Sequence, residues 1–149
     1  MVSFIDENII LLIEDNNDDE ALTLRALKKS NLADKVTVMR DGAEALEYLL
    51  GKEARANPLP AVVFLDLQLP KVSGLGVLEK LREAERTRFL PVVILTSSDL
   101  EEDINMAYRL GCNSFIQKPI DFHRFIDKIG QLSLYWTQLN IHPATVTSC

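Results

Sequence analysis

The sequence lacks the features that would place the protein in a membrane, outside the cell or on a nucleic acid. No apolar run approaches the ~18–20 residues of a membrane span, and no signal peptide precedes the first apolar run. The two cysteines, Cys112 and Cys149, have no metal-binding spacing and are typical of a reducing compartment. No Lys or Arg occurs before Arg25, and the net charge of −6 repels phosphate backbones. These absences predict a cytoplasmic protein that does not bind nucleic acid directly.

Internal repeats, linkers and low-complexity tracts are also missing, so we expect a single globular domain. The 149 residues are 47% hydrophobic and 26% charged, which is the usual balance of a folded domain. A chain of this size buries roughly two-thirds of its unfolded surface. The stretch Asn57-Pro58-Leu59-Pro60 is interpreted as a loop within that domain rather than as a boundary.

Five short apolar runs have the character of buried strands. The clearest, Ala61-Val62-Val63-Phe64-Leu65, stops at Asp66 and is soon followed by Pro70, which cannot continue a strand ladder. A continuously apolar run of this kind indicates a strand buried on both faces, as in a parallel sheet. The five runs cover residues 9–13, 36–39, 61–65, 92–95 and 113–117.

Apolar residues recur at helical spacing after each run. The five stripes are Ala21, Leu24 and Leu27; Ala43, Leu46 and Leu49; Leu75, Leu78 and Leu81; Ile104, Ala107 and Leu110; and Phe122, Phe125, Ile126 and Ile129. Gly111 stops the fourth stripe, and Asp121 is a candidate N-cap for the fifth. Five alternations of strand and helix predict an α/β fold: a doubly wound, five-stranded parallel sheet with helices on both faces.

Polar side chains follow four of the five predicted strands at the point where each strand ends. Glu14 and Asp15 follow the first strand, and Asp66 follows the third. Thr96 follows the fourth strand and Lys118 the fifth. The carboxyl ends of parallel strands lie on one edge of the sheet, where open α/β sheets bind their ligands. We therefore expect these five residues to converge on one site.

The three acids form a candidate metal site. Clustered carboxylates raise each other's pKa unless a cation separates them, and Mg²⁺ prefers oxygen ligands from one or two carboxylates, phosphate and water. We expect Asp15 and Asp66 to be direct ligands and Glu14 to act through water. Gln68 could add its backbone carbonyl. The alternative for acids in this region is helix capping, which suits residues 18–20 better because they lie in the first turn of the first helix.

Asp66 also has the neighbours of a phosphoryl acceptor. A carboxylate can attack phosphorus and form an acyl phosphate, a reaction that depends on positioning and charge neutralisation. The Lys118 ammonium and the Thr96 hydroxyl would each bind one phosphoryl oxygen. Taken singly, a Lys before a Pro is usually a surface residue, and a Thr at a strand end usually forms a turn. Their combination with Asp66 favours the phosphoryl site.

These residues resemble the receiver domains of two-component response regulators. The matching segments are Ile13-Glu14-Asp15-Asn16, Leu65-Asp66-Leu67-Gln68-Leu69-Pro70, Ser73-Gly74, Ile94-Leu95-Thr96-Ser97 and Lys118-Pro119. The resemblance implies that residues 1–130 form a receiver domain with the flavodoxin-like (βα)5 fold. It also implies that Glu14 and Asp15 are the acids of a magnesium site.

The resemblance assigns roles to the remaining site residues as well. It makes Asp66 the phosphoacceptor and Thr96 and Lys118 the phosphoryl sensors. Phe115 falls on the position of the family's aromatic switch, and Lys118-Pro119 would carry its cis peptide bond. Such a protein receives its phosphoryl group from a sensor histidine kinase and changes the surface that it offers to a downstream protein. It is not an enzyme beyond its own phosphorylation and dephosphorylation.

A function from a different class also uses Asp, Thr and Lys at sheet ends. Aspartyl-phosphate hydrolases of the haloacid-dehalogenase kind need a second Asp, two residues after the nucleophile, as general acid. Gln68 occupies that position here and cannot titrate. The chain also has no cap insertion that would exclude water from a substrate, so the response regulator is the favoured interpretation.

The last nineteen residues, 131–149, contain no Lys, Arg, Asp or Glu. The apolar rhythm of the fifth helix continues through them at Leu132, Tyr135, Trp136 and Leu139. We expect an uncharged extension of the last helix that docks either on its own domain or on a second subunit. This extension, with no DNA-binding domain after residue 130, is similar to that of the small single-domain regulators paired with bacterial phytochrome-type kinases. The similarity implies a phytochrome-like kinase and a homodimer formed through the fourth helix, fifth strand and fifth helix.

Overall fold

The computed structural model describes residues 2–3, 5–118, 121–143 and 146–147. Its centre is a parallel sheet of five strands in the order β3-β2-β4-β5-β6. In chain order these strands are β2 (Ile5–Ile13), β3 (Val36–Met39), β4 (Leu59–Leu65), β5 (Val92–Thr96) and β6 (Ser114–Gln117). The chain winds outward from β2 in both directions, which confirms the predicted doubly wound, flavodoxin-like α/β fold.

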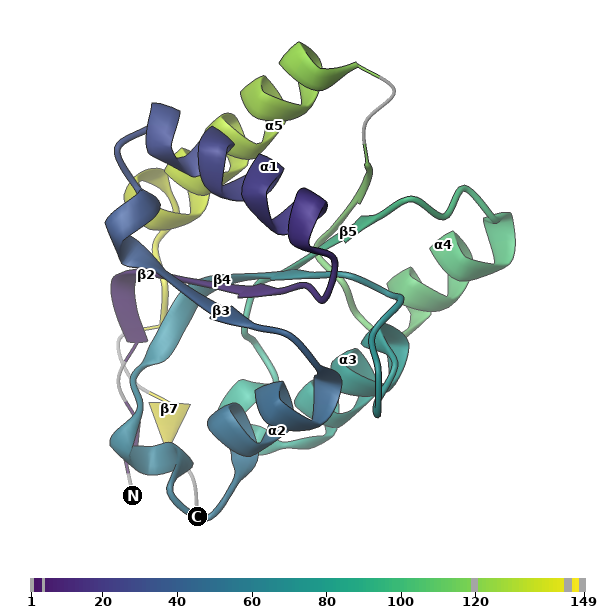
Figure 1. The fold of residues 1–149 in the computed structure, drawn as a ribbon. Coiled ribbons are helices and arrows are strands. Elements are labelled where there is room, and N and C mark those ends of the chain that lie inside the picture. The colour runs from purple at the N-terminus through teal and green to yellow at the C-terminus, as the bar shows by residue number, and fades with distance from the viewer. Residues whose placement is uncertain (1, 4, 119–120, 144–145, 148–149) are drawn as a thin grey trace.

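Five helices cover the sheet: α1 (Asn17–Lys29), α2 (Gly42–Leu50), α3 (Gly74–Glu83), α4 (Glu101–Arg109) and α5 (Phe122–Leu134). Figure 1 shows α1 and α5 on one face and α2 and α3 on the other, with α4 beside α3. The core is divided in the same way into two clusters. Within β4, Val63 and Leu65 point into the cluster under α2 and α3, whereas Val62 and Phe64 point into the cluster under α1 and α5. The strand is therefore buried on both faces, as its continuous apolar run predicted.

Polar N-caps start four of the five helices that lead away from the carboxyl edge of the sheet, and Leu100 at α4 is the exception. Asp121 accepts hydrogen bonds from the backbone N–H groups of His123 and Arg124, which confirms it as the N-cap of α5. The first residue of that helix departs from the predicted stripe. Phe122 is 38% exposed and lies against the Arg25 guanidinium, 5.1 Å from ring centroid to guanidinium carbon, rather than in the core.

The predicted apolar stripe of α1 is confirmed at Leu27 and wrong at Ala21. Ala21 is exposed and Leu24 is half-buried, whereas Thr23 and Leu27 are buried. The Thr23 hydroxyl donates to the Asp19 carbonyl at 3.0 Å, so its polar group is satisfied inside the helix and the side chain can face the core. A search for apolar residues at helical spacing does not identify this position, because Thr is polar.

The stretch predicted as a loop before β4 is partly strand. Leu59 and Pro60 pair with Ile5 and Asp6, so β2 and β4 both start earlier than their apolar runs indicated. The ladder between them is irregular between Asp6 and Ile10. Leu59 is buried in the core, and a proline is tolerated near the beginning of a strand.

The last helix continues past Gly130, as predicted. α5 runs to Leu134 and passes into a π-helical turn, η4 (Tyr135–Leu139). Leu132 and Trp136 pack against the core cluster under α1 and α5, and Thr137 is buried. The extension therefore docks on its own domain along one side. Its other side is exposed, with Leu134, Tyr135, Leu139 and Ile141 in contact with solvent.

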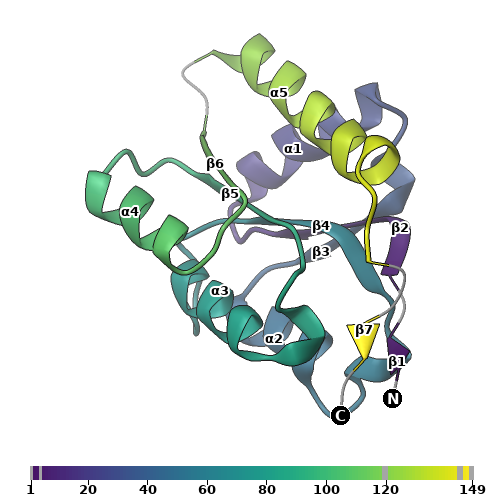
Figure 2. The same cartoon turned by 180° about the vertical axis from the view of Figure 1, so that it is seen from behind.

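The two ends of the chain meet in a small sheet that the sequence did not predict. β1 (Val2–Ser3) pairs antiparallel with β7 (Val146–Thr147), and Figure 2 shows both beside the amino end of β4. Strands of two residues are too short to carry an alternating pattern. In the described ranges, no helix is long and apolar enough to cross a membrane.

Candidate functional site

Three carboxylates meet at the carboxyl edge of the sheet. Glu14 follows β2 and Asp66 follows the neighbouring β4, where its backbone N–H donates to the Ile13 carbonyl at 3.1 Å. Glu14, Asp15 and Asp66 each present a carboxylate oxygen within 4.8 Å of the others. Glu14 and Asp66 are buried, at 1% and 5% exposure, whereas Asp15 is exposed. The structure thus brings together the three acids that the sequence predicted for one site.

The Lys118 ammonium lies among these acids. It donates to Glu14, to Asp66 at 3.0 Å and to Asp19 at 2.9 Å. The backbone of β5 holds Lys118 in place, because the Lys118 N–H donates to the Thr96 carbonyl at 2.7 Å. Burial acts to lower the pKa of Lys118, but the hydrogen bonds to Glu14 and Asp19 and the charge of Asp66 outweigh it and raise that pKa above 10.5. Lys118 is therefore a buried cation.

The cluster carries more negative charge than one ammonium can balance. The pKa of Glu14 is raised to about 8, mainly by burial and secondly by a hydrogen bond with Asp66, although Lys118 acts to lower it. Three carboxylates within reach of one point are the oxygen donors that a hard divalent cation takes. The residues present therefore fit a magnesium-type ion, which would relieve the repulsion among them.

Thr96 ends β5 beside the acids and is fully buried. Its hydroxyl oxygen accepts the Ser98 N–H at 3.3 Å. Between the described residues, no hydrogen bond joins the Thr96 side chain to Asp66 or to Lys118. The hydroxyl is thus on the adjacent strand end, as predicted, but it is not part of the Lys118 network.

The remaining predicted residues surround Asp66 less closely. The Gln68 N–H donates to Asp66 Oδ1 at 3.2 Å, and its side chain is exposed. Phe115 lies on β6 opposite Ile94 and is half-buried against the core cluster under α2 and α3. The predicted cis peptide at Lys118-Pro119 lies outside the described residues, because Pro119 is not among them.

Glycines let the chain after Asp66 pack closely. A Cβ on Gly74 would lie 2.1 Å from the Asp66 carbonyl oxygen, and a Cβ on Gly42 would lie 2.1 Å from the Val72 carbonyl oxygen. The Gly42 N–H also donates to the Pro70 carbonyl at 3.3 Å. The amino end of α2 therefore supports the loop that carries Asp66.

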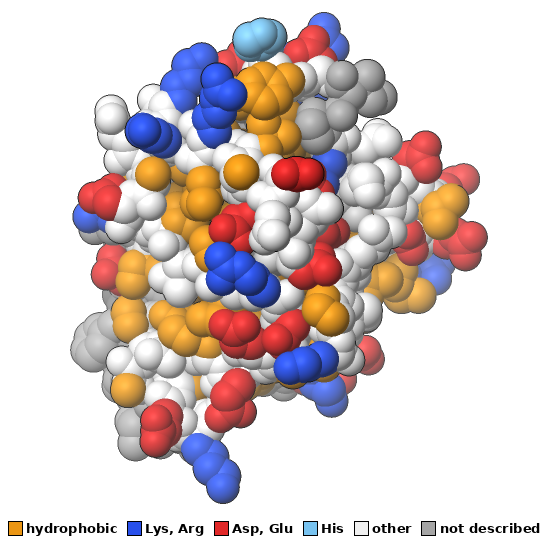
Figure 3. Space-filling view, viewed as in Figure 1, with side chains coloured by type: hydrophobic (Ala, Val, Ile, Leu, Met, Phe, Trp, Pro, Cys, Tyr) orange, Lys and Arg blue, Asp and Glu red, His pale blue; other side chains and the backbone are white. Residues whose placement is uncertain are grey.

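Asp19 is the site residue that sequence reasoning missed. We expected it only to serve the dipole of α1, yet its carboxylate forms an ion pair with Lys118. Helical spacing from Asp15 gave no signal for this contact, because Asp15 precedes the N-cap Asn16 and lies outside the helix. On the face seen in Figure 3, acidic side chains gather around the amino ends of α1 and α2, whereas Lys and Arg cluster towards the carboxyl end of α1.

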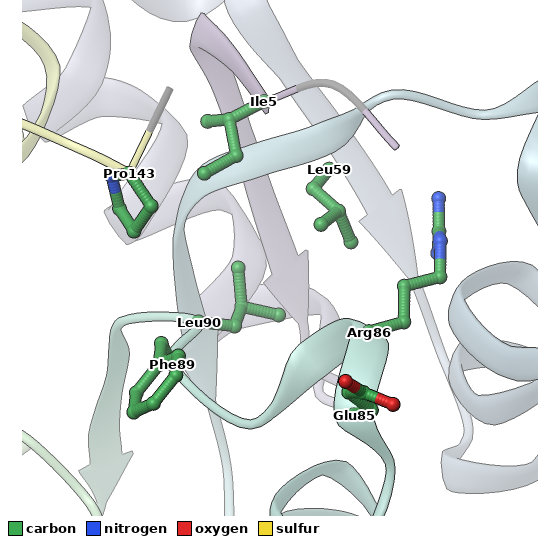
Figure 4. Close-up of a pocket in the computed structure, with 7 residues that line it drawn as sticks. All are labelled: Ile5, Leu59, Glu85, Arg86, Phe89, Leu90 and Pro143. Atoms are coloured by element: carbon green, nitrogen blue, oxygen red, sulfur yellow. The ribbon is translucent and has the colours of Figure 1, made fainter. Parts of the chain in front are cut away.

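A small cavity at the opposite edge of the sheet has different chemistry. Its lining is largely apolar and consists of Ile5, Leu59, Glu85, Arg86, Phe89, Leu90 and Pro143 (Figure 4). The Arg86 guanidinium is directed to backbone carbonyls, those of Leu49, Ala54 and Asn57. This cavity therefore lacks the carboxylate cluster of the site at the carboxyl edge.

Comparison with known proteins gives a consistent set of relatives. The family model described as the response regulator receiver domain matches residues 10–130. The probable methanogenesis regulatory protein FilR2 of Methanothrix harundinacea is 39% identical over 138 residues, which cover 93% of this chain and 89% of FilR2. Response regulator Rcp1 of Synechocystis sp. is 31% identical over 137 residues, which cover 91% of this chain and 93% of Rcp1.

Solved structures agree with these relatives. The Mn(2+)-bound form of Rcp1 has a TM-score of 0.81 at 30% identity and covers 91% of this chain and 99% of its own. The phosphorylated cyanobacterial phytochrome response regulator RcpA has a TM-score of 0.80 at 33% identity, and the match covers 90% of this chain and 96% of RcpA. The bacteriophytochrome response regulator AtBRR is 48% identical, with a TM-score of 0.68, and the match covers 89% of this chain and 96% of AtBRR.

Proposed function

Because this chain belongs to the response regulator receiver domain family, we propose that it works as a phosphorylation switch whose acceptor is Asp66. The chain is a two-component response regulator that accepts a phosphoryl group. The observation that carries the choice of acceptor is the position of Asp66, a buried carboxylate that pairs with Lys118 and follows β4, between β2 with the other acids and β5 with Thr96. Nothing in the site or among the relatives favours a haloacid-dehalogenase-type hydrolase.

The proposed reaction uses residues that already touch one another. A carboxylate oxygen of Asp66 attacks the phosphorus of a phosphohistidine, the P–N bond breaks, and the imidazole nitrogen leaves with the electron pair. The Lys118 ammonium, 3.0 Å from Asp66, neutralises charge on one phosphoryl oxygen. Attack by water on phosphorus later returns the free carboxylate. The chain thus acts only on its own phosphorylation and dephosphorylation.

Glu14, Asp15 and Asp66 are the residues that would hold the metal ion, with the Gln68 backbone carbonyl as a further ligand. We propose that this ion is magnesium, which when bound offsets the charge of the carboxylates and of the phosphoryl oxygens. Glu14 would act through water, whereas Asp15 and Asp66 would be direct ligands.

The proposed readout runs through Thr96 and Phe115. Thr96 ends the strand beside Asp66, and Ile94 of the same strand lies opposite Phe115 on β6. A Thr96 hydroxyl that turns from Ser98 to a phosphoryl oxygen would vacate space next to Phe115, whose ring would then turn inward. The surface near β6 and α4 would change as a result, and a downstream protein would read that change.

The proposed phosphodonor is a phytochrome-like sensor histidine kinase. Support comes from two of the similar structures, RcpA and AtBRR, which are named as phytochrome and bacteriophytochrome response regulators. Phosphotransfer profiling, with purified sensor kinases of several classes, tests the assignment. Fastest transfer from a kinase outside the phytochrome class would contradict it.

Residues 131–149 are proposed to act as an extension, distinct from the receiver domain at 1–130, that helps to form a homodimer. The exposed side of the extension supports this, because a groove there is lined by Ile116, Leu134, Tyr135 and Leu139 among others. Trp136 is not a suitable reporter of the contact, since it packs on its own domain. Truncation after Gly130 would remove core contacts as well, so substitutions on the exposed side are the better test.

The acceptor is tested by labelling with acetyl phosphate and magnesium. Asp66→Asn should abolish labelling and leave the fold intact, as checked by circular dichroism. Asp18→Asn is the matched control, because Asp18 is an exposed acid of α1 near the same site. Labelling of Asp66→Asn at the wild-type level would place the acceptor elsewhere.

A further inference from the structure

Asp19 is held firmly at the edge of the site. It is the third residue of α1, and its backbone N–H donates to Asn16 Oδ1 at 3.0 Å while its carbonyl accepts from the Thr23 hydroxyl at 3.0 Å. These contacts fix the first turn of the helix, and the Asp19 carboxylate reaches Lys118 at 2.9 Å. Asp19 is not one of the three acids that could share a cation. Its contact with the site is therefore through Lys118.

The Lys118 ammonium has no hydrogen left for a new acceptor. An ammonium group carries three N–H bonds, and Glu14, Asp19 and Asp66 each accept one of them. A phosphoryl oxygen can bind Lys118 only if one of these hydrogen bonds is given up. Phosphorylation thus requires an exchange of partners at this ammonium.

The three partners differ in how easily they can be released. The Glu14 side chain is 1% exposed, and releasing it would leave a buried carboxyl group without a hydrogen-bond partner. Asp66 carries the incoming group, so its own oxygen lies next to the phosphoryl oxygens. The Asp19 side chain is 33% exposed, and water can take the place of Lys118 there. Asp19 is therefore the partner that the ammonium exchanges.

We propose that Asp19 is a positioning residue that holds Lys118 in the unphosphorylated state and competes with the phosphoryl group for its ammonium. This rests on the function proposed above for Asp66 and Lys118. Asp19 then biases the switch towards its resting state, because the phosphorylated state must first displace this carboxylate from Lys118. Removing the carboxylate should favour the phosphorylated state.

The test measures the dissociation constant of beryllofluoride, a phosphoryl mimic, by fluorine NMR with magnesium present. Asp19→Ala should bind the mimic about threefold more tightly than the wild type, the size expected for one partly exposed ion pair. Asp19→Glu, which keeps a carboxylate, should restore weaker binding. Asp18→Ala is the matched control, since it removes the same charge from the same helical turn and should leave binding unchanged.

A double-mutant cycle separates positioning from general charge. In a Lys118→Ala background, Asp19→Ala should have no effect on mimic binding, because the ammonium it holds is gone. Tighter binding that persists in this background, or that Asp18→Ala reproduces, would overturn the proposal, as would unchanged binding in Asp19→Ala. Failure of the underlying function gives a different result: acetyl phosphate would then label Asp66→Asn as well as the wild type.

Discussion

Two buried cations, one at each edge of the sheet, differ in the hydrogen bonds that hold them. Lys118, at the carboxyl edge, is held by side-chain carboxylates. Arg86, at the amino edge, donates to three backbone carbonyls, one near the end of α2 and two in the α2–β4 connection. Carboxylates can be released to water or bind a different cation, whereas backbone carbonyls stay where the fold puts them. The comparison teaches that burial of a charge does not mark a functional residue, but exchangeable partners do.

The largest expected effect comes from replacing each cation with Met. Arg86→Met leaves buried carbonyls unsatisfied and should lower the free energy of unfolding by about 3 kcal/mol. Lys118→Met leaves buried carboxylates without their cation. Without divalent cations it should lower the free energy of unfolding by a similar amount. Magnesium should restore part of the loss in Lys118→Met, because Glu14, Asp15 and Asp66 can bind it, and none in Arg86→Met. Urea unfolding with and without magnesium measures both. Equal rescue of the two variants would remove the distinction between the two edges.

A smaller effect is expected from pH at the carboxyl edge. The pKa of Glu14 is raised from 4.5 to about 8, chiefly by burial. Between these values the folded chain keeps a proton that the unfolded chain releases, so the free energy of unfolding should fall as pH rises through this window. Urea unfolding at pH 5 and pH 8 without divalent cations checks this. Glu14→Gln should flatten the dependence, and an unchanged slope in that variant would contradict the assignment.

Thr96→Ala should affect the readout more than the chemistry. Asp66 and Lys118 remain in this variant, so acetyl phosphate should still label it, though more slowly. The buried Thr96 hydroxyl is lost, so Phe115 should no longer change its rotamer with phosphorylation. Crystals with beryllofluoride should show the ring turned inward in the wild type only. A Phe115 ring that keeps one rotamer in the wild type, with and without the mimic, would discredit this switch.

The smallest effect on folding is expected on the exposed side of the extension. Leu139 is 74% exposed, so Leu139→Glu should change the free energy of unfolding by less than about 0.5 kcal/mol. If the extension forms a dimer, the same change should turn it into monomers in sedimentation. Gln138→Glu is the control, because Gln138 is an exposed neighbour outside the groove. A wild-type protein that is monomeric at high concentration would rule out the dimer.

The sheet and the residues at its carboxyl edge could be predicted from the sequence. Continuously apolar runs predict buried strands, and a parallel sheet brings the carboxyl ends of all its strands to one edge. Glu14, Asp66 and Lys118 could therefore be placed together although 104 residues separate the first from the last. The parallel topology alone brings these three residues close together, so their individual contacts did not have to be known in advance.

Contacts between individual side chains depend on how the elements pack and could not be predicted from the sequence. Asp19 and Asp18 are alike in sequence, and the angle at which α1 packs on the sheet directs Asp19 to Lys118, 99 residues away. Leu59 and Pro60 are strand because they pair with β2, and Trp136 packs against the core cluster under α1 and α5. Periodicity reports which face of an element is apolar, but pairings between distant segments depend on packing, which local pattern does not encode.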